Sequence, residues 1–126
     1  MTYKANPVHR KGTPGKSQWR ISPDDEMGCF ASARANRWLV EVEKIGWGLH
    51  LPAGKPNYVG VARDHDTKVF VAKFTADQDV WHGYPADHRQ NYRDIPTERI
   101  LDGWMRSGLL TRAKIRKIAR GQPCRL

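Results

Sequence analysis

The chain has 126 residues with a formal net charge of +9, and 39% of its residues are hydrophobic and 10% aromatic. This length predicts one domain, and the apolar content excludes an intrinsically disordered protein. No apolar run approaches the roughly 20 residues that a membrane span needs, and the polar start is unlike a signal peptide, so we expect a cytoplasmic protein with no membrane partner.

The first twenty residues are basic and contain almost nothing that a core could bury. They carry a charge of +5 with no Asp or Glu, and Gly12, Pro14 and Gly15 interrupt any regular element. This composition is typical of a flexible segment. We therefore predict a flexible basic arm over 1–20, followed by a single α+β domain over 21–126.

A helix and several strands are predicted next. Ser22 can cap a helix, Pro23 suits its first position, and the acids that follow favour the positive end of the helix dipole, so the helix extends to about Asn36. β-rich runs predict strands over 38–44, 47–51, 57–62 and 68–74, and the last two form a hairpin. The expected architecture is a small antiparallel sheet of three or four strands, with this helix before it.

Residues 75–96 show no periodicity and predict a long loop. Loops of about twenty residues in compact domains are often functional or disordered. Trp81, Tyr84 and Tyr92 favour an ordered loop, because aromatic rings bury a large area.

The C-terminal part predicts a basic helical hairpin. Thr97 and Thr111 can each cap a helix, and Gly108 can end the first of them in a left-handed conformation. Gly121 ends the second. Residues 103–126 carry +7 with no acid, so both ends of the chain are basic while the middle has a slight negative charge.

The second C-terminal helix offers a phosphate-binding surface. Arg112, Arg116 and Arg120 recur at every fourth position and share one face, which Lys114 and Lys117 widen. A merely solvated face usually mixes both signs of charge, and this one carries no acid. A helix-turn-helix motif has apolar residues at the positions that Lys114 and Lys117 occupy here. We therefore predict contact with phosphates and no base-specific reading of DNA.

The predicted loop gathers residue types that a metal-independent ribonuclease uses. His82 and His88 can act as acid and base on RNA, and Arg89 or Arg93 can stabilise charge on a phosphate. The alternative is structural, with imidazoles bonded to backbone carbonyls and aromatic rings that fix the loop to the core. The candidate stacking platforms for unpaired bases are Trp81 and Tyr84.

No motif predicts a metal or a cofactor. CxxC, HxxxH, HExxH, GxGxxG and GxxxxGK[ST] are all absent. The two cysteines, Cys29 and Cys124, are expected to be free thiols of a reducing compartment.

Three functional hypotheses remain open. The first is a small nucleic-acid-binding protein whose basic ends contact phosphates, with RNA or single-stranded DNA favoured because aromatic rings can stack on unpaired bases. The second is a ribonuclease of the small toxin kind that uses His82 and His88. The third is an interaction module or inhibitor that binds an acidic protein.

Overall fold

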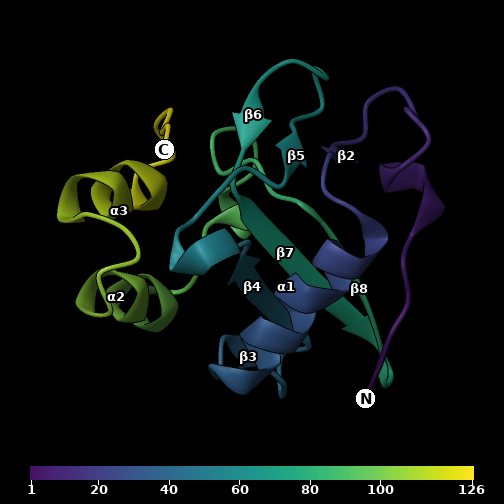
Figure 1. Ribbon diagram of the computed structural model, residues 1–126, viewed down its shortest axis with the longest axis horizontal. Helices are drawn as coiled ribbons and strands as arrows, with labels where there is room; N and C mark the ends of the chain where they lie inside the picture. The colour runs from purple at the N-terminus through teal and green to yellow at the C-terminus, as the bar shows by residue number, and fades with distance from the viewer.

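The computed structural model describes residues 1–126 and has an α+β fold, as predicted (Figure 1). A five-stranded sheet has the order β1 (Thr2–Tyr3), β8 (Val80–Pro85), β7 (Val71–Asp77), β4 (Ile45–Leu49) and β3 (Leu39–Val40). A three-stranded sheet has the order β2 (Gln18–Trp19), β5 (Gly60–Val61) and β6 (Lys68–Val69). All neighbours are antiparallel except β1, which runs parallel to β8. The strands thus form two sheets, where the sequence predicted one.

The helices begin and end close to where the sequence predicts them. They are α1 (Pro23–Ala35), α2 (Glu98–Arg106) and α3 (Arg112–Ala119), with short 3-10 helices at Pro7–His9, Pro52–Gly54 and Tyr92–Asp94. Ser22 caps α1 and Thr111 caps α3, whereas the hydroxyl of Thr97 makes no capping hydrogen bond to α2. Gly108 follows α2 with a φ of 76°. None of these helices has the length and apolar content to cross a membrane.

Helix α1 covers one face of the large sheet, in front of β4 and β7 in Figure 1. Phe30 of α1 meets Phe74 of β7 edge to face, with ring centroids 5.4 Å apart. Gly83 of β8 lies beneath the same ring. A Cβ at position 83 would come within 2.6 Å of Phe74 and 2.7 Å of the Tyr3 hydroxyl, so only glycine allows β1, β7 and β8 to pack this closely.

The other face of the large sheet is covered by the segment that follows β8. The Trp47 indole N–H donates to the carbonyl oxygen of Asp94 at 3.1 Å, and the Lys73 ammonium donates to the carbonyl oxygen of Arg93. That ammonium also lies 4.6 Å from the centre of a Trp47 ring. Burial lowers the pKa of Lys73, although the Asp94 carboxylate opposes the shift. Lys73 therefore fixes the segment to the sheet.

The first twenty residues are part of the folded domain, which corrects the prediction of a flexible arm. Strand β1 belongs to the five-stranded sheet, and strand β2 belongs to the three-stranded sheet. The fully buried Gln18 accepts from the Gly12 amide at 2.9 Å and donates to the carbonyl oxygens of Val8 and Lys16. The prediction overlooked Trp19, which is buried in the core, and the polar contacts and backbone pairing that also hold this segment in place.

The predicted loop over 75–96 is also corrected in its first half. Residues 80–85 form β8, which pairs with β7 through a tight turn that places Gln78 at a φ of 56°. Alternate residues of β8 are buried, which is the period of a strand. The predicted pairing of 57–62 with 68–74 is confirmed only between β5 and β6, because β7 leaves to join the large sheet.

Candidate functional site

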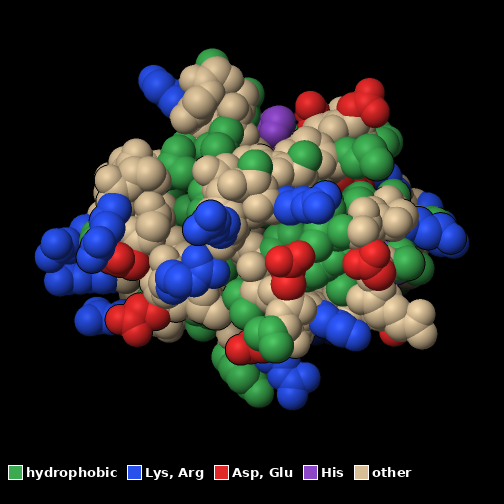
Figure 2. All heavy atoms as spheres, turned by 90° about the horizontal axis from the view of Figure 1, so that it is seen from below, with side chains coloured by type: hydrophobic (Ala, Val, Ile, Leu, Met, Phe, Trp, Pro, Cys, Tyr) green, Lys and Arg blue, Asp and Glu red, His purple; other side chains and the backbone are tan.

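Helix α3 presents a positive surface without acidic partners. Arg112, Arg116, Lys117 and Arg120 are exposed and Lys114 is half-buried. The four ion pairs of the structure involve none of them. In Figure 2, Lys and Arg side chains outnumber acidic ones on the left, the end of the molecule formed by α2 and α3. These five cations are therefore free to meet a ligand.

A single buried side chain anchors α3. Ile118 is fully buried, whereas Ile115 is only half-buried. Ala119 is exposed. The helix therefore lies at the surface with most of its circumference accessible.

A cavity adjoins the end of α3. It has a volume of about 520 Å³ and is lined by Tyr58 and by parts of three segments, 66–71, 86–89 and 123–125. Its apolar wall consists of the buried side chains of Val69, Phe70, Val71 and Ala86. Cavities of this size with an apolar wall and a few polar groups are typical of small-ligand sites.

Arg89 lines this cavity, and its guanidinium is held in place by Asp87. Its Nε donates to Asp87 Oδ1 at 2.9 Å and its Nη2 donates to Asp87 Oδ2 at 2.8 Å. The hydrogen bonds to Asp87 raise the pKa of Arg89, so the group stays charged. Asp87 is held in turn, because its amide donates to Asp94 Oδ2 at 3.0 Å and Tyr84 donates to Asp94 Oδ1 at 2.7 Å. The Nη1 group of Arg89 has no partner in the protein.

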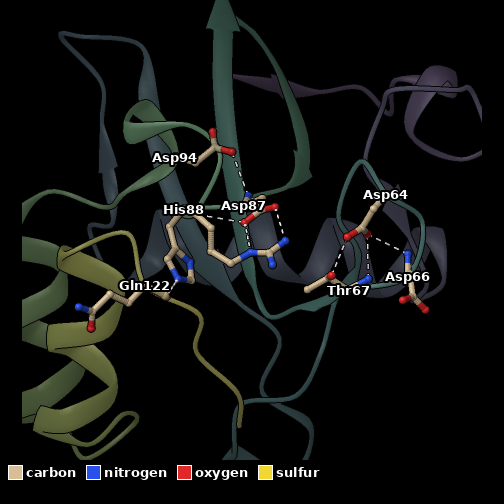
Figure 3. Close-up of polar contacts among 8 residues, drawn as sticks. Asp64, Asp66, Thr67, Asp87, His88, Asp94 and Gln122 are labelled. Carbon is tan, nitrogen blue, oxygen red and sulfur yellow. Dashed lines mark hydrogen bonds and ion pairs between the residues drawn. The ribbon is translucent and has the colours of Figure 1, made fainter.

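His88 joins this cluster to the end of α3. Its Nε2 lies 2.6 Å from the carbonyl oxygen of Gln122, three residues after Ala119, the last residue of the helix (Figure 3). Because a carbonyl only accepts, Nε2 carries a proton, and in the neutral imidazole Nδ1 keeps a free lone pair. The contact places the predicted residues His88 and Arg89 next to the predicted phosphate-binding helix. No local sequence signal connects the two segments.

An acidic turn, drawn beside Asp87 in Figure 3, lies close enough to Arg89 for their charges to interact. Asp64 accepts from the amides of Asp66 and Thr67 and from the Thr67 hydroxyl at 2.6 Å. These hydrogen bonds, that of the hydroxyl first, lower the pKa of Asp64 to about 2. The turn therefore holds a permanent negative charge near the guanidinium while its own backbone stays fixed.

The remaining charges of the cavity are mostly positive. The Lys68 ammonium lies 5.6 Å from the centre of the Tyr58 ring, and neither Lys68 nor Arg125 is ion-paired. Asp66 is the unpaired acid, since Asp87 is bound to Arg89. A ligand with a negative group and a polar ring fits this distribution.

The structure does not bring the two predicted catalytic histidines together. His82 is on β8, and its Nδ1 lies 2.7 Å from the carbonyl oxygen of Lys4 near the start of the chain. His88 lies beyond the end of β8 and bonds to Gln122 near the other end. No hydrogen bond joins the two imidazoles, and each bonds to the backbone of a different segment of the chain.

The rings of the two predicted stacking platforms, Trp81 and Tyr84, pack against other side chains of the protein. Trp81 is 2% exposed and packs against Phe30 with centroids 5.7 Å apart, so its ring is part of the core. Tyr84 is half-buried, bonded to Asp94 and stacked on His9 at 5.4 Å. The exposed aromatic residue of this segment is instead Tyr92, beneath the guanidinium of Arg93 at 5.7 Å.

His9 is a half-buried polar residue that the sequence did not single out. Its Nδ1 lies 2.9 Å from the carbonyl oxygen of Ser17, and it lines a second, mainly polar cavity of about 380 Å³. Burial lowers the pKa of His9, with a smaller contribution from the charge of Lys16, while the Ser17 carbonyl and Glu26 oppose the shift. This imidazole is therefore neutral over a wider pH range than a free one.

Comparison with known proteins adds no family. The chain matches no protein-family model, no curated protein and no solved structure. Within the structure, no three His, Cys, Asp or Glu side chains gather closely enough to hold a metal ion. The site is thus defined by its cations, its fixed arginine and its cavity.

Proposed function

We propose that the protein binds single-stranded nucleic acid, RNA or DNA, through the basic face of α3. The observation that carries this proposal is the set of five cations between Arg112 and Arg120, none of which has an ion-pair partner. Such a set is costly in mutual repulsion unless a polyanion neutralises it. Phosphates in sequence along a strand supply that neutralisation and release counterions.

Single strands are favoured over duplex DNA for two reasons. The positions of Lys114 and Lys117 do not fit a helix-turn-helix, so a groove-reading pose has no support. The cavity at the end of α3 can admit an unpaired base, whereas a base within a duplex is stacked on both sides.

The test is a titration of fluorescently labelled twelve-nucleotide single strands at several salt concentrations. The triple variant Arg112→Ala, Arg116→Ala, Arg120→Ala should weaken binding on the order of 10- to 100-fold at low salt. It should also flatten the slope of log K against log salt by about 2, since each lost phosphate contact on a single strand contributes about 0.7.

A matched variant makes the same charge change at the other end of the chain. Lys11, Lys16 and Arg20 are exposed, and changing all three to Ala should flatten the slope by less than half as much. These residues lie outside the helices and therefore do not share a helix face. Equal effects of the two variants, or no binding of any single strand by the unmodified protein, would overturn the proposal.

A further inference from the structure

We propose that the cavity beside α3 holds one unpaired guanine of the bound strand, hydrogen-bonded by Arg89. This inference rests on the proposed function, because α3 supplies the phosphate contacts that bring the strand to the cavity. It adds base selectivity to a surface that would otherwise bind any sequence.

The free edge of the Arg89 guanidinium carries the argument. Asp87 engages one edge, Nε with Nη2, at 2.9 and 2.8 Å. The opposite edge, Nη1 with the second N–H of Nη2, presents two parallel donors that nothing in the protein accepts. Two parallel donors match the O6 and N7 acceptors of guanine, which is the commonest specific contact between arginine and a base.

Adenine and uracil do not satisfy this edge. Adenine presents an amino donor beside N7, which opposes an arginine N–H, and the N3–H donor of uracil separates its two carbonyl acceptors. Unpaired cytosine has the adjacent acceptors N3 and O2, but it lacks the N1 and N2 donors of guanine. Asp87 is itself fixed through Asp94, so the guanidinium cannot easily turn to meet a different pattern. A fixed donor pair discriminates more strongly than a mobile one, because a wrong base leaves buried donors unpaired.

The cavity around Arg89 suits the rest of a purine. Its volume of about 520 Å³ lies within the range of small-ligand sites, and Val69 and Phe70 form part of an apolar wall for the ring. The free lone pair of His88 Nδ1 and the carboxylate of Asp66 line the same cavity and can accept from the N1 and N2 donors of guanine. Lys68 and Arg125 are available to the flanking phosphates.

The experiment compares twelve-nucleotide uridine strands that contain one central guanine, one central adenine or neither. The guanine strand should bind about 10-fold more tightly than the other two, the discrimination expected of one bidentate arginine contact. Arg89→Lys keeps the positive charge but removes the pair of parallel N–H donors. The affinity for the guanine strand relative to the other two strands should therefore fall to about 1. Arg34→Lys, an exposed arginine of α1 outside the cavity, is the matched control and should leave the ratio unchanged.

A second titration separates this inference from the proposed function. Guanosine monophosphate alone should bind the unmodified protein and the α3 triple variant alike, and Arg89→Lys should weaken that binding. Binding of the mononucleotide without any binding of strands would support the cavity and overturn the proposed function. Strand binding without a guanine preference, or a preference that survives Arg89→Lys in a folded protein, would overturn the inference.

Discussion

The two basic ends of the chain look alike in sequence and differ in the structure. Residues 1–20 and 103–126 both lack acids. The N-terminal end runs along the right side of Figure 1, contributes a strand to each sheet and inserts Gln18 and Trp19 into the interior. The C-terminal end folds into α3, which concentrates five cations on one short helix.

The difference shows what charge composition can and cannot reveal. The N-terminal end is held by an acid from elsewhere in the chain, since Glu26 accepts from both Arg10, at 2.7 Å, and the Tyr3 hydroxyl. The cations of α3 have no such partner. A basic composition is therefore compatible with an integrated segment and with a binding surface, and only the location of the acids distinguishes them.

The strongest test of this comparison is Glu26→Ala. Glu26 is 1% exposed, and its loss leaves Arg10 and the Tyr3 hydroxyl without their partner. We expect the free energy of unfolding to fall by about 3–4 kcal/mol, as when one member of a buried ion pair is removed. Urea denaturation followed by tryptophan fluorescence measures the change.

Asp25→Ala is the matched control, because Asp25 is an exposed carboxylate in the same turn of α1. It loses only an interaction with the helix dipole, worth about 0.5 kcal/mol. If both variants lost the same small amount, the N-terminal end would be a weakly attached arm after all.

Ile118→Ala, in the C-terminal helix α3, should lower the free energy of unfolding slightly less than Glu26→Ala does. Ile118 is the fully buried side chain of α3, and truncating such a residue costs about 3 kcal/mol through lost burial and a new cavity. Ile115→Ala, at a half-buried position on the same helix, should cost about 1 kcal/mol. Urea denaturation compares the two, and equal losses would show that α3 is not anchored at Ile118.

The smallest expected effect is on the pH dependence of stability, and it comes from His9. Because burial lowers the pKa of His9, the unfolded chain binds more protons than the folded one as the pH falls through 6.5. This contribution to stability is present above pH 6.5 and is lost progressively below it. His9→Gln should therefore make the urea midpoint less dependent on pH between 7.5 and 5.5. A midpoint with the same pH dependence as that of the unmodified protein would exclude His9 as its source.

The elements that the sequence predicted well are those with local signals. The cap at Ser22 and the glycine at Gly108 act on the residues next to them, so α1 and the helical hairpin begin and end nearly where expected. Strand β8 was missed although residues 80–85 alternate in burial, because Gly83 and Pro85 are poor strand formers on their own.

The candidate site was only partly predictable for the same reason. Arg112, Arg116 and Arg120 share a face through helix periodicity alone, and the pairing of Arg89 with Asp87 is local in sequence. The contact of His88 with Gln122 spans 34 positions, and the cavity needs Tyr58 and the 66–71 segment as well. Burial of Trp81 against Phe30 likewise depends on how α1 lies on the sheet, which no local pattern encodes.

The parallel pairing of β1 with β8 sets an order of events during synthesis. Thr2 pairs with Val80, so β1 stays unpaired until a partner 78 positions further along the chain has been made. At roughly 5–20 residues per second, that interval lasts on the order of 4–16 s. The antiparallel hairpin of β7 and β8 is local in sequence, so the edge along which β1 pairs is complete as soon as β8 has been made.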